Sequence, residues 1–444
     1  MRVFYAIFLV IIISVTACDQ PANAPQDEVI GTKDSEVRLS KEKVELEFWS
    51  HYPGWESIAA AFEKKYPNVT VNIKTSTYET YVDKYEQALA DGRAPDILIV
   101  DSEHFGRFAS IQGLENLLDH GAGKYRDDFS SSLWDINYSF DGKSLIGFPS
   151  GSSPLITYYR ADIMEKFGFP SDPEELGTYM EDSNNWLKIA RTLKAEESYI
   201  TEWPMDVVQI FESTVGLYTE DMKFARNNKT FENALEIAST VYNEGLTSST
   251  DTWTKSGAEA LNNGKVAMLY MGTWGASQLE QWAPDTTGLW RQTRLPFNVY
   301  GWANSSSFMI PSSSKNKDWA FAFIEFCVTV YSLNGAGNSV PSYLPARSNE
   351  ERLSKGSPFF GGQRLYNINE MLANRMVETR LTPIDGQTKT IWAKVLNQGI
   401  DRKKSADLIL DEAQQEIFNS LNEEINILRN YLESVQKAEV SEQP

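Results

Sequence analysis

The sequence predicts an α/β fold, and the first folded stretch carries that prediction. Segments with alternating apolar residues lie at 44–49 and 69–73, and each precedes a stretch with helical apolar spacing, at 55–66 and 78–89. Residues 96–100 are apolar on both faces, which is typical of a buried parallel strand. Strands that alternate with helices predict a doubly wound sheet, whose ligands bind beyond the carboxyl ends of the strands.

The first eighteen residues predict where the protein resides. Arg2 precedes an apolar run from Val3 to Val15, which suits a secretory signal and is too short to cross a hydrocarbon core of ~30 Å. The ending Val15-Thr16-Ala17-Cys18 resembles the bacterial lipobox. We therefore expect a lipoprotein signal peptide over 1–17 and a lipidated Cys18, which places the protein outside the cytoplasm and anchors it to the cell membrane. The alternative is an ordinary signal peptide followed by an incidental cysteine.

Composition divides the rest of the chain into a tether and a body. Residues 19–40 are rich in proline, acidic and small polar residues, which cannot bury enough apolar surface to fold, so we expect a flexible tether over 18–43. The roughly 400 residues that follow are enough for two domains. Apolar residues recur every three or four positions from Ala406 to Val435, which predicts a long amphipathic helix, and we expect a disordered tail over 438–444.

The formal net charge of −20 excludes some classes of partner. An acidic surface argues against nucleic acid and against adhesion to anionic lipid headgroups, so we expect membrane contact through the lipid anchor only. With three histidines in the chain we expect no metal site, and we expect no cofactor. Cys327 lies in an apolar run without a second body cysteine, so it is expected to be a buried free thiol.

Several segments follow one another in a distinctive order over about 44–435. They are FWSHYPGWESIAAAFEKKYPNVTVNI, GRAPDILIVDSEHFGRFASIQGLENL, GKSLIGFPSGSSPLITYYRADIMEKFGF, GAEALNNGKVAMLYMGTWGAS, SSSFMIPSSSKNKDWAFAFIEF, YLPAR and TIWAKVLNQG. In this order the chain resembles the extracellular solute-binding proteins of ABC importers, in the sugar-binding family 1 that includes maltose-binding protein.

The resemblance implies a two-lobed periplasmic-binding-protein-like fold, each lobe a doubly wound sheet flanked by helices, with three hinge crossings. The crossings are expected near Pro149–Pro154, Gly288–Pro296 and Ile310–Ser314. Lobe one would then comprise 44–150 plus 295–311, and lobe two would comprise 155–290 plus 315–437.

The resemblance also points to aromatic residues that would hold a sugar. A pyranose has an apolar face and a rim of hydroxyls, so its site needs a ring for stacking and polar groups for the rim. Trp274 follows a strand-like run and a Gly-Thr turn, where the tryptophan of the family commonly stacks on the sugar. Trp392 and Trp203 match two further aromatics of the cleft. For each tryptophan, packing in the core is the alternative.

Polar partners are expected from the loops that follow the strands of lobe one. Glu103 aligns with a carboxylate that binds sugar hydroxyls in the family, while His104 replaces the neighbouring arginine and leaves the identity of the ligand open. Asp101 is expected either to contact ligand or to cap the next helix. The other candidates for ligand contact are His51, Tyr52, Tyr78, Trp302, Asn304 and Tyr343.

These features predict a binding protein and not an enzyme. The expected ligand is a small-molecule sugar or oligosaccharide, which a monomer delivers to two permease membrane subunits of an ABC importer. A non-sugar solute, or a sensor as the recipient, is the alternative, and a secreted carbohydrate-active enzyme is less favoured. The chain lacks the motifs G-x-S-x-G, H-E-x-x-H and G-x-x-x-x-G-K-[ST], which would indicate catalysis or nucleotide binding.

Overall fold

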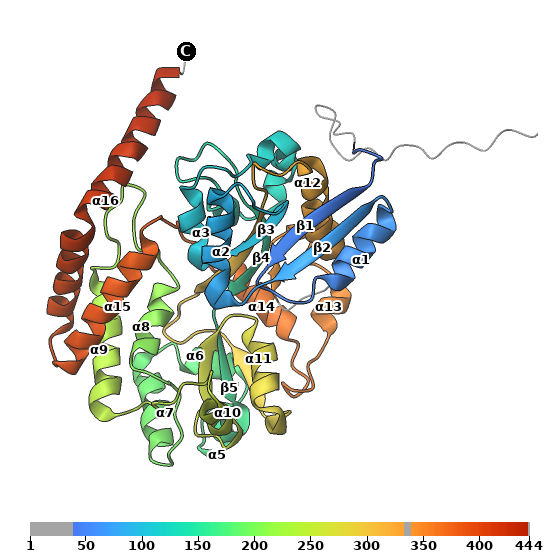
Figure 1. Cartoon of the computed structure of the whole chain (residues 1–444). Coiled ribbons are helices and arrows are strands. Elements are labelled where there is room, and N and C mark those ends of the chain that lie inside the picture. The colour runs from blue at the N-terminus through green and yellow to red at the C-terminus, as the bar shows by residue number, and fades with distance from the viewer. Residues whose placement is uncertain (1–38, 333–338, 443–444) are drawn as a thin grey trace, which may run out of the picture. The chain divides into compact units, whose positions relative to one another are not determined.

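The computed structural model describes residues 39–332 and 339–442, with two β-sheets and the helices around them (Figure 1). The predicted signal peptide over 1–17, Cys18 and most of the predicted tether lie outside the described residues. The last five tether residues are described, and they contact the body. Leu39 packs against the first-sheet core, and the Asn68 amide donates to the carbonyls of Ser40 and Glu42. The prediction of a flexible tether is therefore wrong for residues 39–43.

The first sheet has six strands in the order β2-β1-β3-β8-β4-β9. Its parallel half matches the sequence prediction, because β1 pairs in parallel with both β2 and β3. The other half is antiparallel, since β8 lies between β3 and β4 and runs opposite to both. The strands are β1 (Val44–Ser50), β2 (Val69–Thr75), β3 (Ile97–Asp101), β4 (Phe148–Pro154), β8 (Trp302–Met309) and β9 (Val340–Pro341).

Helices α1 and α2 connect the parallel strands, as the apolar spacing predicted, and α3 follows β3. A π-helix, η4, continues α12 along the same sheet. The helical elements around this sheet are α1 (Glu56–Lys65), α2 (Tyr78–Ala90), α3 (Ser102–Ala109), η1 (Leu117–His120), η2 (Ala122–Asp128), α4 (Ser131–Asp135), α12 (Lys317–Glu325) and η4 (Phe326–Tyr331).

The second sheet has three antiparallel strands in the order β6-β5-β7. The α/β class and the two-lobed fold are as predicted, but this small sheet is not doubly wound. The reason is that β6 and β7 each return to β5 after long helical stretches and run opposite to it. The strands are β5 (Ile156–Arg160), β6 (Met268–Met271) and β7 (Trp290–Thr293).

The helices of the second lobe are fixed at their ends by local chemistry. In α9, for example, the Asn228 side chain accepts hydrogen bonds from the first-turn N–H groups of Thr230 and Phe231, and Gly245 ends the helix with a left-handed φ of 60°. The elements between β5 and β7 are α5 (Ala161–Lys166), α6 (Pro173–Tyr179), α7 (Ser183–Lys194), α8 (Met205–Glu212), α9 (Lys229–Glu244), α10 (Lys255–Asn262), α11 (Gly275–Trp282) and η3 (Pro284–Thr286).

The chain passes from the first sheet to the second at Leu155, the single residue between β4 and β5, and returns over 294–301, between β7 and β8. The third crossing, predicted near Ile310–Ser314, is wrong. Helix α12 and the π-helix stay in the core of the first sheet, where Trp319 and Phe323 are buried. Assignment of 315–332 to lobe two is wrong for the same reason, and β9 is wrongly assigned to that lobe because it pairs with β4. An apolar run that is buried on all sides does not indicate which sheet it covers.

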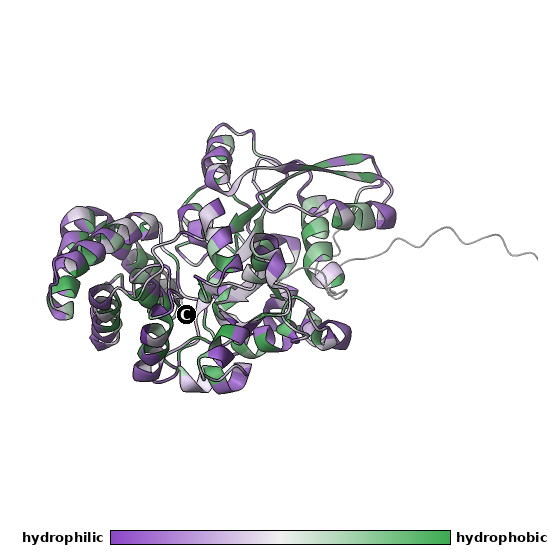
Figure 2. Cartoon of the chain, turned by 90° about the horizontal axis from the view of Figure 1, so that it is seen from below, coloured by the Kyte–Doolittle hydropathy of each residue, from purple (hydrophilic) through white to green (hydrophobic). Residues whose placement is uncertain are grey.

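The last part of the chain is helical. Its elements are η6 (Leu344–Ala346), α13 (Glu350–Ser354), α14 (Leu365–Ala373), α15 (Asp385–Asp401) and α16 (Ala406–Glu442). The predicted amphipathic helix is present as α16, which packs on α15 and α9 and is interrupted at Leu421, with φ −127° and ψ 15°. In Figure 2 the helices at this end of the body combine hydrophobic and hydrophilic residues. The predicted tail is wrong for 438–442, because no glycine or proline ends the helix before Glu442.

We expect Gly106→Ala to destabilise the fold by about 1–3 kcal/mol. A Cβ at this position of α3 would lie 2.2 Å from the Thr382 carbonyl oxygen, so the helix and the 379–385 segment would have to separate. Gly386→Ala is the matched control, because its new Cβ meets nothing within 4 Å on α15. Urea unfolding measures both variants. Equal stability of Gly106→Ala and the unsubstituted protein would contradict the prediction.

Candidate functional site

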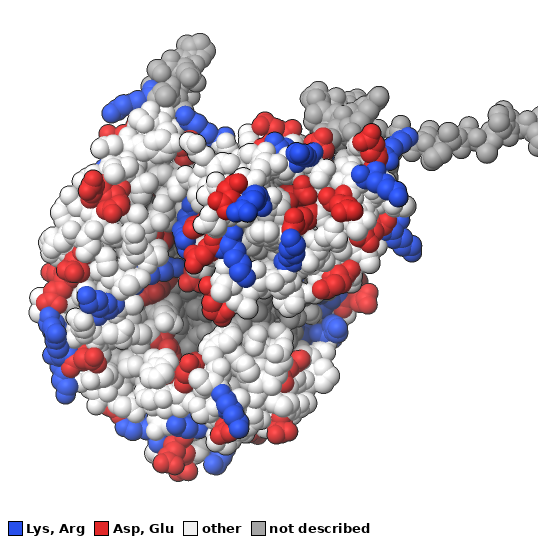
Figure 3. Space-filling view, viewed as in Figure 1, with Lys and Arg blue, Asp and Glu red and all other residues white. Residues whose placement is uncertain are grey.

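A cavity of about 890 Å³ lies between the two sheets, at the carboxyl ends of β1 and β3 (Figure 3). In that view the surface is hollowed between the α2–α3 region and the α8–α11 region, with acidic side chains around the hollow. The antiparallel direction of β8 brings its first residues to the same edge of the first sheet. The volume falls near the upper end of the range for small-molecule sites, roughly 300–1,000 Å³.

The wall on the first-sheet side is organised around Asp101, whose side chain is 2% exposed. One carboxylate oxygen, Oδ2, accepts hydrogen bonds from the Tyr52 hydroxyl at 2.9 Å and from the Asn304 amide at 2.8 Å. The other, Oδ1, accepts from the backbone N–H of Glu103 at 2.9 Å and so caps α3. Burial raises the pKa of this carboxyl above its usual value. The cap predicted from sequence is thus present in a residue that also lines the cavity.

Polar atoms on three side chains of this wall form no hydrogen bond within the described residues. The buried imidazole of His51 stacks on Tyr81, with ring centroids 4.1 Å apart and planes 16° apart, and neither ring nitrogen is bonded. The indole N–H of Trp302 and the amide oxygen of Asn304 are also unpaired. Burial lowers the pKa of His51 to about 4, so the ring is neutral at pH 7.

The opposite wall contains two carboxylates at the start of α8. Asp206 Oδ2 accepts from the backbone N–H groups of Glu202 at 2.7 Å and Trp203 at 3.0 Å, which fixes the turn before the helix. Glu202 in turn accepts from the backbone N–H of Thr252 at 2.8 Å. Burial, together with the nearby Glu202 charge, raises the pKa of Asp206 to about 7. Asp206 therefore changes charge near neutral pH.

Two arginines in the cavity lining are bound to protein groups. Arg226 is 4% exposed, pairs with the Glu212 carboxylate at 3.3 Å and donates to the carbonyls of Glu212 and Val215. Arg380 lies over the Phe140 ring at 5.1 Å and donates to the carbonyl of Glu220. These bonds hold the loops of this wall, although Arg226 Nε and Nη1 form no hydrogen bond to the described residues. A third cation, Lys389, also lines the cavity.

An indole wall, formed by Trp274, Trp253 and Trp282, borders the cavity beyond β6. Trp274 follows β6 after Gly272 and Thr273 and directly precedes α11, as the strand-and-turn pattern predicted. Its ring centroid lies 5.9 Å from that of Trp253, and Trp253 lies 4.8 Å from Trp282 in an edge-to-face contact. Trp274 and Trp253 both line the cavity.

Most of the residues predicted as ligand contacts are brought together in this cavity. Tyr78 and Glu103 face each other there, because the Tyr78 hydroxyl donates to the Glu103 carboxylate at 2.7 Å. The predicted residues that line the cavity are His51, Tyr52, Tyr78, Asp101, Glu103, Trp274, Trp302 and Asn304.

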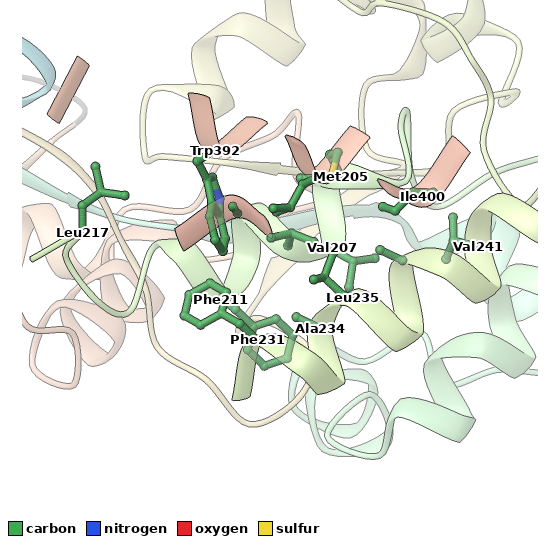
Figure 4. Packing of buried hydrophobic residues seen from close by; sticks show 14 of the residues in the cluster. Met205, Val207, Phe211, Leu217, Phe231, Ala234, Leu235, Val241, Trp392 and Ile400 are labelled. Atoms are coloured by element: carbon green, nitrogen blue, oxygen red, sulfur yellow. The ribbon is translucent and has the colours of Figure 1, made fainter. Parts of the chain in front are cut away.

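Three predicted contacts lie outside the cavity lining. Trp392 is 1% exposed and packs among apolar side chains of α8 and α9, with its indole N–H donated to Glu212 at 2.6 Å (Figure 4). Trp203 is 45% exposed to solvent. Tyr343 packs against Tyr125 and Phe129 under the first sheet. Trp392 and Tyr343 do not line the cavity because their side chains pack inside the body.

Several cavity residues of the second lobe were not predicted from the sequence. They are Glu202, Asp206, Arg226, Trp253 and Arg380. They lie on α8 and on loops between helices, where no periodic pattern marks a functional position. Of these, Glu202 and Asp206 lie within three residues of Trp203, which was predicted to contact the ligand.

No helix of the described residues is long and apolar enough to cross a membrane. Within the same residues, no three His, Cys, Asp or Glu side chains are grouped as metal ligands would be. Cys327 is a buried free thiol, as predicted.

The body is similar in sequence to one family of proteins. The family model for bacterial extracellular solute-binding proteins matches residues 49–329. A protein of Brucella abortus (strain 2308) whose name describes it as a binding protein is 24% identical over 295 residues, which cover 62% of this chain and 68% of that protein.

Solved structures share the fold at low sequence identity. A crystal structure named extracellular solute-binding protein family 1 matches with a TM-score of 0.73 and 18% identity, over 87% of this chain and 100% of that chain. The galacto-N-biose/lacto-N-biose I-binding protein of a Bifidobacterium longum ABC transporter, in complex with lacto-N-biose, matches at 0.68 and 18%, over 86% and 98%. An ABC transporter associated binding protein of B. animalis subsp. lactis Bl-04, in complex with β-1,6-galactobiose, matches at 0.68 and 20%, over 86% and 98%.

We expect Asp206→Asn to change how stability depends on pH. The folded-state pKa of about 7 lies above the ordinary value of 3.8. Between about pH 4 and pH 7, Asp206 is therefore protonated in the folded protein and ionised in the unfolded chain. Across that window the Asp206 contribution to stability falls as pH rises, by at most about 1.4 kcal/mol per pH unit. As pH rises over this range, the free energy of unfolding of the asparagine variant should therefore increase relative to that of the unsubstituted protein.

Urea unfolding at pH 5 and pH 7.5 measures the difference between the two proteins, in which titrating groups that do not interact with Asp206 cancel. The nearby Glu202 interacts with Asp206, so its contribution belongs to the measured difference. Glu244→Gln, an exposed carboxylate paired with Arg191 outside the cavity, is the control, and it should show no such gain. A constant difference between Asp206→Asn and the unsubstituted protein at both pH values would contradict the assignment.

Proposed function

Because this chain belongs to the family of bacterial extracellular solute-binding proteins, we propose that it captures a sugar or oligosaccharide between its two lobes and delivers it to an ABC importer. Two solved proteins of the same fold, which are ABC transporter binding proteins, hold lacto-N-biose and β-1,6-galactobiose. Their identity to this chain is 18–20%, so the support for a sugar must come from the cavity itself.

The observation that carries the proposal is the composition of the cavity lining. The Trp274 indole lies on the second-lobe wall, and the first-sheet wall holds polar atoms that have no hydrogen-bond partner. Leaving a buried polar group without a partner costs about 1–3 kcal/mol. The unpaired groups of the first wall are a donor on Trp302, an acceptor on Asn304 and a neutral imidazole on His51, which offers one of each. A hydroxyl both donates and accepts, so the hydroxyl rim of a sugar can pair with all three. Its apolar face can lie on Trp274.

The charges of the cavity favour a neutral ligand. An anionic ligand would meet an excess of carboxyl groups, because the described residues of the lining hold three cations, Arg226, Arg380 and Lys389, and Arg226 is ion-paired with Glu212. The acidic residues of the lining are Glu79, Asp101, Glu103, Glu202, Asp206, Glu212 and Asp385. The carboxylates of Glu103 and Asp206 accept hydrogen bonds, and sugar hydroxyls are suitable donors for them. These groups can hold a ligand through hydrogen bonds alone. This supports the proposal that the protein binds its ligand and does not catalyse a reaction.

Closure of the lobes is the proposed way in which the ligand is held. The two sheets are connected by the short crossing at Leu155 and by residues 294–301. Ligand favours the closed arrangement only by the difference between its affinities for the closed and open states. The closed monomer would then be recognised by two permease membrane subunits. A lipid anchor on Cys18 would keep the protein near them, which raises its effective concentration at the importer.

We expect saccharides to raise the melting temperature of the protein that lacks residues 1–18, because a ligand of the native state stabilises it. The test is a thermal-shift screen of mono-, di- and trisaccharides. For each saccharide that binds, Trp274→Ala should weaken binding by about 1–3 kcal/mol, or roughly 5- to 150-fold, since the variant lacks the stacking surface. Isothermal titration calorimetry measures the change.

Trp203→Ala is the matched control, because this indole is exposed and lies outside the cavity lining. Its dissociation constants should equal those of the unsubstituted protein. Unchanged affinity of a folded Trp274→Ala variant would refute the stacking role, and conversion of a saccharide to product would refute the non-catalytic assignment.

We expect the full-length chain to incorporate labelled palmitate in a bacterial host and to fractionate with membranes. Cys18→Ser should remove the label and release the protein, because Cys18 carries the proposed anchor. Cys327→Ser is the control, since its thiol is buried in the body and should not affect labelling. Label that persists in Cys18→Ser would exclude the anchor.

A further inference from the structure

We propose that Glu378 is a positioning residue that fixes the arrangement of the two lobes. It lies in residues 374–384, which connect α14 to α15 and which we call the bridging segment. Its carboxyl group binds this segment to the first lobe, the one built around the six-stranded sheet. The inference rests on the movement of the lobes proposed above and adds the contact that controls it.

The bridging segment is held by the second lobe. Arg380 donates to the carbonyl of Glu220, and the Arg380 carbonyl oxygen would lie 3.2 Å from a Cβ at Gly216. Helix α15, which follows the segment, packs on α9 and α16. On this helix the Thr388 hydroxyl lies 2.7 Å from the Tyr218 hydroxyl. The end of the segment therefore follows the second lobe.

The same segment is also bound to the first lobe. The Thr382 carbonyl oxygen would lie 2.2 Å from a Cβ at Gly106, so the segment and α3 touch through their backbones. Side-chain bonds come from Glu378. Its Oε2 accepts from the Ser132 hydroxyl on α4 at 2.5 Å, and its Oε1 accepts from the Ser152 hydroxyl on β4 at 3.1 Å. One carboxyl group thus joins the segment to two elements of the first lobe.

The position of Ser152 makes this contact a link to the lobe crossing. Ser152 lies on β4 three residues before Leu155, the single residue between β4 and β5. Next to Glu378 in the chain, residues 379–381 line the ligand cavity. Glu378 itself is outside the cavity lining. It therefore connects the strand that enters the crossing with a segment that forms part of the cavity wall.

Burial makes the two hydrogen bonds depend on how the lobes are arranged. Glu378 is 7% exposed, and Ser152 is 4% exposed. A buried carboxyl group is costly unless its oxygens find donors, and here both donors belong to the first lobe. If the bridging segment moved away with the second lobe, Glu378 would lose them. The cost of the unpaired oxygens opposes that movement.

Distances between two spin labels, one on each lobe, test the proposal without a ligand. The full-length chain carries Cys18→Ser, and the other native thiol, Cys327, is buried. Labels are attached through Asp83→Cys on α2 and Lys255→Cys on α10, both at exposed positions. Double electron–electron resonance measures the distribution of distances.

We expect Glu378→Ala to broaden this distribution. The ratio of molecules outside the main distance peak to those within it should rise about fivefold or more, because the variant lacks both buried hydrogen bonds. Ser152→Ala removes one donor and should give a smaller change in the same direction. Adding Ser152→Ala to Glu378→Ala should give no further change, since the bond is already lost.

Two variants separate positioning from stability. Glu325 is also a buried carboxylate of the first lobe, but its partners Lys124, at 2.7 Å, and Tyr125, at 2.6 Å, belong to the same lobe. Glu325→Ala should lower stability to urea and leave the distances unchanged. Glu378→Gln keeps an acceptor for one serine and offers a donor to the other, so it should retain the distribution of the unsubstituted protein.

The inference and the proposed function fail in different ways. An unchanged distribution in Glu378→Ala overturns the inference, and so does equal broadening in Glu325→Ala or in Glu378→Gln. Saccharide binding can stand in each of these cases. If no saccharide binds the unsubstituted protein, the proposed function fails, and the distances still decide whether Glu378 fixes the lobes.

Discussion

The arrangement of the binding wall depends on the buried carboxylate of Asp101. A charge that is removed from water is costly unless its oxygens find donors. Here the donors are the Tyr52 hydroxyl, the Asn304 amide and the N–H of Glu103 at the start of α3. These groups follow β1, begin β8 and follow β3. The bonds that satisfy one carboxylate therefore also fix the three strand ends that surround the ligand cavity.

The antiparallel insertion of β8 makes this arrangement possible. Residues 302–304 lie about two hundred positions after Asp101 in sequence, yet β8 pairs along β3 and reaches the same edge of the sheet. Because β4, the other neighbour of β8, continues into β5 after the single residue Leu155, the binding wall is directly connected to the crossing between the lobes. Trp302 and Asn304 therefore lie on a strand whose neighbour leads directly into that crossing.

Local patterns were sufficient to predict the parallel half of the first sheet. The strands and helices between Val44 and Ala109 are contiguous, so alternation and helical spacing identify them without knowledge of distant contacts. Trp274 was placed by its strand and turn. In contrast, α12 is apolar on all sides, and Trp392 occupies a helix whose inner face could have met either the core or the cleft. The loop that carries Trp253 is bound to Glu202 through the backbone N–H of Thr252, which lies 50 positions from that carboxylate, and no local pattern reveals such a bond.

On the wall opposite the first sheet, Asp206 can either accept or donate a hydrogen bond. Asp206 uses Oδ2 for two backbone N–H groups, and among the described residues Oδ1 forms no bond to protein. Because burial raises its pKa to about 7, the carboxyl can accept from a hydroxyl when ionised and donate to one when protonated. Across the cavity, neutral His51 has the same double capacity. A charged ligand would gain from only one of these states, whereas a hydroxyl can pair with both. The two walls therefore share a preference for hydroxyl groups, although they are built from different chemistry and from separate parts of the chain.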